Sequence, residues 1–415
     1  MAGGAKKKRV ARSSKSKKKG GVQDAVSELT DDVLADILSR LPIKSLCHCK
    51  LVCRRWRNLI SHPEHRKKLP QTLAGFFYGS YDRNGFPEWA RHFINVSGAG
   101  HPLIEPSLSF LPVYERIDMV DSCNGLLLCR GWKSTHPVTM DYVVCNPATE
   151  KWVVVPESGF SSKVKYYEVR IARLGFDPAI SPHFHVFEFI PDDVWYMDDE
   201  KMNGNSFDGR IEVVAVYSSK AGIWSFNEDH FKWGDQFAMR TDSKSVFLNG
   251  VLHLTSYYGM ILAFDVKGNG LRCIPVPTPD YDDYGDIPDC GVYLSQGHLY
   301  FAAGNIYKEP HDSESELSVW VLKDYNSENW SLKHNVNPLH MFGEHYYSQF
   351  EDNFSVISIH PEHGTVFMVC GTDKRLVSYE MGHMRLRSVS QFLCHSSTSY
   401  IPYVPLFSGS LAEEH

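Results

Sequence analysis

The sequence predicts three short helices followed by a large all-β part that closes into a propeller of six blades, within a range of six to eight. Apolar residues recur at helical spacing only between residues 28 and 69. From about residue 72, short runs of Val, Ile, Phe, Tyr and Trp alternate with turns of Gly, Pro, Asn and Asp. A glycine stands at the same place before several of these strands, which indicates a repeated β unit.

The helical module begins at Thr30, whose side chain is suited to cap a helix. Asp31 and Asp32 follow in the first turn, where the helix dipole favours negative charge. Pro42 ends this helix, because the residue before a proline avoids the helical region. Three apolar series predict three helices: Val33, Leu34, Ile37, Leu38 and Leu41; then Leu46, Leu51 and Val52; then Trp56, Leu59 and Ile60.

A helical segment of about 40 residues cannot bury all of this apolar surface by itself, so part of it is expected to face a partner. The order and spacing of these residues resemble the F-box, the module that docks onto the Skp adaptor of cullin-based ubiquitin ligases. The alternative is a helical bundle packed on the rest of the chain. The resemblance implies a Skp-binding set of Leu29, Leu34, Ile37, Leu38, Leu41, Pro42, Leu46, Leu51, Val52, Cys53, Trp56 and Leu59.

Cysteines and histidines also cluster in this module and raise the question of zinc. Zinc sites usually space their first ligand pair two to four residues apart, often across a turn. Here only one residue separates Cys47 from Cys49, within a predicted helix. The position of Cys53 on the apolar face of that helix explains this cysteine without a metal. We therefore expect no metal site and no cofactor.

In the β part, tight turns with glycine precede apolar strands at Asn124-Gly125, Asn249-Gly250, Gln296-Gly297 and His363-Gly364, where glycine is able to take positive φ. The long gap after the first turn has room for one more unit, from Val169 to Phe226. Residues 73–79, 91–96 and 400–404 are expected to form a sixth blade from both chain ends, which would remove exposed strand edges. An array of β-sandwiches is the alternative.

The first of these units also carries two short motifs. Asp121-Ser122-Cys123-Asn124-Gly125-Leu126 is followed by Asn146-Pro147-Ala148-Thr149 and then Trp152. Together they resemble the plant F-box-associated domain, a kelch-like propeller that follows an F-box, although the double glycine typical of kelch repeats is absent. The expected organisation is a disordered basic tail (1–26), an F-box (27–70), the propeller (71–407) and a flexible C-terminal tail (408–415).

Charge is divided unevenly along the chain. Residues 1–20 hold nine Lys or Arg and no acidic residue. Because the whole chain has a net charge of −6, the remaining residues carry a net charge of −15. Such an acidic body is a poor general binder of nucleic acid. Lys6, Lys7, Lys8 and Arg9 are typical of a nuclear-localisation signal, but a solvated basic tail is an equal alternative. Without a signal peptide or an apolar run long enough to span a membrane, we expect a location in the nucleus, the cytoplasm or both.

No catalytic constellation is recognisable: there is no GxSxG elbow, no phosphate-binding loop and no HExxH motif. The connections between predicted strands are instead rich in aromatic residues, which are typical interface anchors, unless they pack on neighbouring loops. The predicted target-binding residues are Trp195, Tyr196, Tyr257, Tyr258, Tyr281, Tyr284, Tyr346 and Tyr347.

Taken with the two resemblances, these features imply a non-catalytic substrate adaptor of an SCF-type (Skp–cullin–F-box) ubiquitin ligase. Its partners would be a Skp-family adaptor, through it a cullin scaffold, and a protein target. The alternatives are an F-box sensor that binds a glycan or metabolite, or a propeller enzyme.

Overall fold

A computed structural model describes the chain at residues 29–41, 52–61, 72–80, 90–98, 104–136, 139–159, 171–191, 209–227, 238–239, 243–256, 259–277, 290–304, 316–342, 354–371, 373–392 and 396–406, and at the single positions 1, 45, 49, 102 and 411. Two helices, α1 (Asp31–Ser39) and α3 (Arg54–Ser61), come before the sheets. The predicted middle helix falls largely outside the described residues. None of the described helices is long and apolar enough to cross a membrane.

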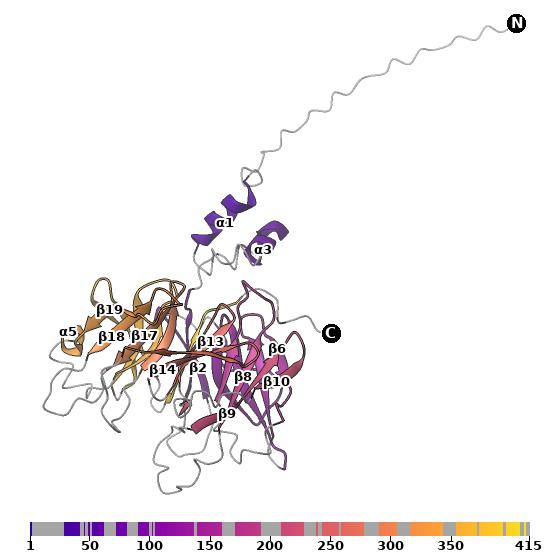
Figure 1. The fold of residues 1–415 in the computed structure, drawn as a ribbon. Coiled ribbons are helices and arrows are strands. Elements are labelled where there is room, and N and C mark those ends of the chain that lie inside the picture. The colour runs from indigo at the N-terminus through magenta and orange to yellow at the C-terminus, as the bar shows by residue number, and fades with distance from the viewer. Residues whose placement is uncertain are drawn as a thin grey trace.

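The remaining described elements form six antiparallel sheets, each of which is one blade (Figure 1). The first blade consists of β3 (Arg116–Cys123), β4 (Leu126–Lys133), β5 (Thr139–Asn146) and β6 (Lys151–Val155). The second blade consists of β7 (Ile171–Gly175), β8 (His185–Pro191), β9 (Gly209–Ser218) and β10 (Ile223–Asn227), with β11 (Ala238–Met239) paired to β9. The third is β12 (Ser245–Leu248), β13 (Val251–Thr255), β14 (Met260–Asp265) and β15 (Gly270–Pro275).

The last three blades complete the chain. The fourth is β16 (Cys290–Ser295), β17 (His298–Gly304), β18 (Leu317–Leu322) and β19 (Ser331–Val336), followed by the short helix α5 (Pro338–Phe342). The fifth is β20 (Phe354–Ile359), β21 (Thr365–Cys370), β22 (Arg375–Glu380) and β23 (Arg385–Gln391). The sixth joins β24 (Ser396–Tyr403) to β1 (Gly75–Ser80) and β2 (Ala90–Asn95).

The ring is closed. The first strand of each sheet lies innermost, and these strands contact one another in the order β3, β7, β12, β16, β20, β24 and back to β3. In the sixth blade the C-terminal strand β24 pairs with the N-terminal strand β1, with Gly75 opposite Tyr403. The prediction of six blades, the last built from both chain ends, is confirmed.

Apolar side chains fill the seams between neighbouring sheets. Between the first and second blades, Leu126, Leu128 and Val144 pack against Leu174 and Val186, and all five are fully buried. Strand alternation explains this, because successive side chains of a blade point to the seams on its two sides. Each sheet is therefore buried on both faces, as the apolar runs in the sequence require.

Two faces of the ring can be told apart. We call the turn face the end that carries the tight turn between the first two strands of a blade, and the loop face the opposite end. Three predicted turns have left-handed residues at both positions: Asn124-Gly125, Asn249-Gly250 and Gln296-Gly297. The prediction is wrong at His363-Gly364, where Gly364 has no positive φ and residues 360–364 make a wider connection closed by a 2.8 Å bond from the His360 N–H to the Thr365 carbonyl.

Candidate functional site

The two helices pack against each other through one face of α1. Leu34, Ala35 and Leu38 lie on that face, and each is only 1% exposed. They contact Leu59 and Ile60 of α3, which are also buried. This face therefore stabilises the helix pair.

Polar contacts join the same two helices at the start of α1. The guanidinium of Arg55 donates to the Asp31 carboxylate at 2.8 Å and to the Leu29 carbonyl. The Leu34 N–H donates to the Thr30 carbonyl at 3.0 Å, which places Thr30 at the cap position. The predicted side-chain cap does not form, because no hydrogen bond runs from the Thr30 side chain to the helix.

The opposite side of α1 carries an apolar ridge. Val33 is 47% exposed and Ile37 is 45% exposed, and residues four apart lie one turn above the other on the same side of a helix. Val52, just before α3, is 64% exposed. Aliphatic side chains at this exposure leave apolar area in water, which a partner surface can cover. We call Val33 and Ile37 the apolar ridge, and Val52 is a further exposed apolar residue of the same helical segment.

The predicted Skp-binding residues thus fall into groups with different exposure. Leu34, Leu38 and Leu59 are buried between the helices, whereas Ile37, Val52 and Cys53 are exposed. Those of intermediate exposure are Leu29, Leu41 and Trp56, and those outside the described residues are Pro42, Leu46 and Leu51. Sequence reasoning left Val33 out of the set, although its spacing of four from Ile37 was a signal.

All eight aromatic residues predicted to bind a target lie outside the described residues, as does the basic tail. The strands that flank those aromatics are described. Their connections join β8 to β9, β13 to β14, β15 to β16 and β19 to β20. In each blade the antiparallel pairing places the strand ends that border these connections at the loop face.

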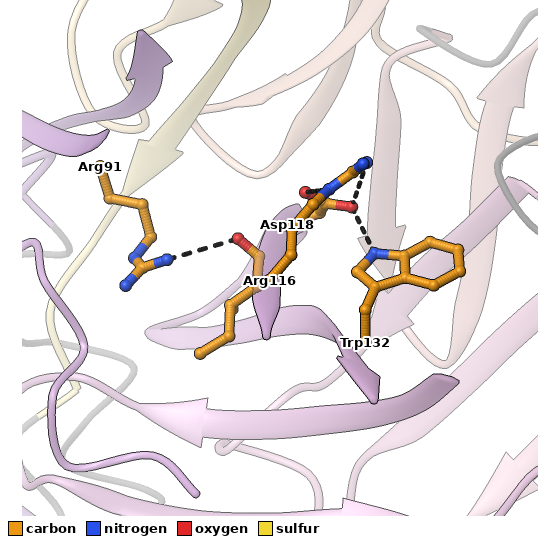
Figure 2. A network of polar contacts seen from close by, with 5 residues as sticks. Arg91, Arg116, Asp118 and Trp132 are labelled. Atoms are coloured by element: carbon orange, nitrogen blue, oxygen red, sulfur yellow. Dashed lines mark hydrogen bonds and ion pairs between the residues drawn. The ribbon is translucent and has the colours of Figure 1, made fainter. Parts of the chain in front are cut away.

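A polar network that sequence reasoning missed lies on the first blade, at the loop-face ends of β3 and β4. Figure 2 shows Arg116 and Trp132 converging on the carboxylate of Asp118. Both Arg116 bonds measure 2.8 Å, the indole N–H bond measures 2.6 Å, and the guanidinium carbon lies 5.5 Å from the Trp132 ring centre. The network holds together the loop-face ends of β3 and β4, beside the sixth blade.

Arg91 of β2 reaches this region from the sixth blade (Figure 2). Its guanidinium donates to the carbonyls of Ser107, at 2.6 and 3.1 Å, and of Ile117, at 3.5 Å. Burial lowers the pKa of Arg91. No short sequence signal could have found this residue, because its partners lie 16 and 26 positions further along the chain.

The motif at residues 121–126 joins blades to one another. Asp121 accepts a 2.8 Å hydrogen bond from the N–H of Leu174 on the second blade. The Ser122 hydroxyl donates to the Pro402 carbonyl on the sixth. The Asn124 amide donates to the Phe176 carbonyl at 2.7 Å. Sequence reasoning singled out this motif, and the structure shows that its polar side chains hold three blades together.

The chain matches two known protein families. Residues 26–68 match the F-box domain, and residues 106–399 match the family described as F-box protein At3g26010-like, beta-propeller. Among relatives in Arabidopsis thaliana, F-box protein At5g07610 is 29% identical over 79% of this chain and 76% of its own length. F-box protein At5g49610 is 26% identical over 74% of this chain and 78% of its own length.

Proposed function

The chain belongs to the F-box protein family with an At3g26010-like beta-propeller, and from this membership we propose that it is the substrate-recognition subunit of an SCF-type ubiquitin ligase. The F-box helices would dock on a Skp-family adaptor and, through it, on a cullin scaffold. The propeller would hold the protein target. The chain would form no covalent intermediate and would act by raising the concentration of the target near the conjugating enzyme.

The observation that carries this proposal is the apolar ridge on α1. Val33, Ile37 and Val52 stay exposed although Leu34 and Leu38 of the same segment are buried. Exposed apolar side chains that lie together on a helix are typical of a surface that a partner covers. The ridge is therefore the surface that we assign to Skp docking, and the buried residues act by fixing its shape.

The position of the chain's entry into the propeller also supports an adaptor. Leu73 and Ala74 lead into β1, and Gly75 begins that strand opposite Tyr403, at the turn face. The connections predicted to carry the target-binding aromatic residues lie at the other end of the ring, the loop face. We propose that the loop face binds the target, so that the F-box and the target attach to opposite ends of the ring.

Binding of the full-length protein to a purified Skp adaptor tests the proposal. Ile37→Asp places a carboxylate on the ridge, where burial without a partner costs several kcal/mol, so we expect affinity to fall about 100-fold or more. Ile180→Asp is the matched control, because Ile180 is 62% exposed on a turn of the propeller. No binding by the folded wild type, or equal loss in both variants, would contradict the proposal.

The choice of Ile37 follows from the structure. Leu34 and Leu38 are each 1% exposed between the helices, so an aspartate there would disrupt the helix pair itself. Loss of binding in such a variant would not distinguish docking from folding. Ile37→Asp leaves that packing intact, and circular dichroism of the variant checks that it does.

A further inference from the structure

The strand β6 is the outermost strand of the first blade and lies at the rim of the ring (Figure 1). Its inner edge pairs with β5, from Lys151 opposite Asn146 to Val155 opposite Tyr142. No strand in the described part of the chain pairs with its outer edge. The outer edge of a sheet is a template on which another chain can add a strand, unless side chains prevent it.

Most of the other outer strands carry a side chain that opposes such pairing. Charged residues within an edge strand, whether exposed or pointing inward, have this effect. They are Arg91 in β2, Arg272 in β15, Lys333 in β19 and Arg387 in β23. The strand β10 has no charge, but the side-chain amide of its last residue, Asn227, is bound to Asn269 of the next blade at 2.6 Å. In β6 a tryptophan and three valines follow a single lysine at the first position, so this strand is the least protected.

Two apolar side chains of β6 are in contact with water. Trp152 is 40% exposed and Val154 is 36% exposed, and residues two apart on a strand point to the same face. Trp152 lies opposite Cys145, which packs in the seam with the sixth blade. The described strands of the sixth blade number three, whereas the first blade has four. The strands of the sixth blade therefore end one position short of β6 and leave this face of it uncovered.

The strand is complementary to itself. When two copies of β6 pair antiparallel about a two-fold axis at Val153, Trp152 of one copy lies opposite Val154 of the other. Residues directly opposite each other point to the same face, and an aromatic residue beside a β-branched one is a favourable cross-strand pair. The two-fold axis produces this pair twice. Each copy would thus cover the apolar side chains that the other exposes.

Charge also favours the antiparallel alignment. Lys151 begins the strand, Glu157 stands two residues beyond its end, and both are exposed. In the same register Lys151 of one copy and Glu157 of the other are diagonal neighbours, a separation that long side chains can span. An ammonium group has three N–H donors, so a contact within its own chain does not prevent one with the second copy.

We propose that this chain forms a homodimer in which the β6 strands of two copies pair antiparallel and join two four-stranded blades into one continuous sheet. A strand of five residues offers less surface than the interfaces of permanent dimers, so the dimer is a weak one that forms as the protein concentration rises. The proposal goes beyond the proposed function and does not depend on Skp binding. Two propellers in one assembly would increase the avidity for a target that carries its binding segment twice.

Sedimentation velocity of the full-length protein, over a series of micromolar concentrations, tests the proposal. We expect the wild type to pass from monomer to dimer as the concentration rises. Val154→Lys places a charge opposite Trp152 of the second copy and should lower the association constant at least tenfold. Leu332→Lys is the matched control, because Leu332 is 57% exposed on β19, the outer strand of the fourth blade, and it should associate as wild type does.

A charge reversal tests the register. Glu157→Lys should weaken the dimer, because it places like charges together at both ends of the strand pair, and the double variant Lys151→Glu/Glu157→Lys should restore it. Both residues are exposed, so the variants keep the fold, which thermal unfolding checks. The proposal is overturned if the wild type is monomeric at every concentration, if Val154→Lys and Leu332→Lys associate equally, or if the double variant associates no better than Glu157→Lys. A monomeric wild type that still binds the Skp adaptor would overturn the dimer alone and leave the proposed function in place.

Discussion

The carboxylate of Asp121, on the innermost strand of one blade, accepts a 2.8 Å hydrogen bond from the backbone N–H of Leu174, on the innermost strand of the next. The same carboxylate receives the Ser245 hydroxyl from the third blade at 3.4 Å. Burial raises the pKa of Asp121, while Arg173 and these donors act in the opposite direction. One side chain thus joins three consecutive blades near the axis of the ring.

Replacement of Asp121 by alanine is expected to destabilise the propeller. It leaves the Leu174 N–H without its acceptor and removes a charge partner of Arg173, and an unsatisfied buried donor costs about 1–3 kcal/mol. We expect the free energy of unfolding, measured in urea, to fall by at least that amount. Asp324→Ala is the control, because Asp324 lies on an exposed turn, where its carboxylate accepts a hydrogen bond from the Asn326 N–H. Equal effects of the two changes would contradict the bridging role.

The turn after Asp121 gives a second prediction, with a matched control in the same chain. Gly125 has φ +90°, and a Cβ there would lie 2.2 Å from the Cβ of Leu406, just beyond the last strand. Gly250 occupies the corresponding turn of the third blade with φ +81° and nothing within 4 Å of its Cβ position.

Both alanine variants incur the strain of positive φ, about 1 kcal/mol, but only Gly125→Ala also pushes the C-terminal segment away. We therefore expect Gly125→Ala to lower the unfolding temperature clearly more than Gly250→Ala does. Similar shifts would mean that Leu406 contributes little to closure of the ring.

Local signals were sufficient for much of this fold. Asn124-Gly125 and Asn249-Gly250 could be predicted as hairpin turns because Asn and Gly accept left-handed backbone without help from neighbours. The prediction of a tight turn at His363-Gly364 was wrong because a glycine permits positive φ but does not require it. The sixth blade could be predicted because an open ring would leave strand edges unpaired.

Contacts between distant residues could not be read from the sequence. Asp121 meets Leu174 and Ser245 from 53 and 124 positions away, and no local pattern marks those partners. In the helices, periodicity identified Leu34, Ile37 and Leu38 together. Which of them stay exposed follows only from the packing of α3, which covers Leu34 and Leu38 and leaves Ile37 exposed.

The helix pair gives a third prediction, in which packing outweighs charge. Arg55 and Asp31 form an ion pair at 2.8 Å with side chains 37% and 62% exposed, and surface pairs of this kind contribute about 0–1 kcal/mol. Leu38 is 1% exposed, and truncation of a buried leucine costs about 2–5 kcal/mol. We expect Leu38→Ala to abolish most Skp binding and helical signal, and Arg55→Ala to change affinity less than about fivefold. The reverse order, measured by calorimetry, would mean that the ion pair organises the F-box.

The last prediction concerns pH and a buried histidine. His253 of β13 is fully buried, and its Nε2 lies 2.8 Å from the Tyr325 hydroxyl. Burial, with a smaller contribution from nearby Arg272, lowers the pKa of His253 to about 4. In the unfolded chain the imidazole titrates near its ordinary value of about 6.5. Between these two values the unfolded chain binds more protons than the folded one, so stability falls as the pH falls.

The stability that depends on neutral His253 is fully present above about pH 6.5 and is lost progressively as the pH falls to about 4. The total loss over this interval is roughly 3 kcal/mol. His253→Gln removes the titrating group, so the variant should lose stability less steeply than wild type over this interval. Urea unfolding at a series of pH values measures both slopes, and the difference at pH 7.5, where both side chains are neutral, gives the cost of the substitution itself. Parallel curves from pH 7.5 to pH 4 would show that His253 is protonated without unfolding, and that the acid sensitivity of the propeller arises elsewhere.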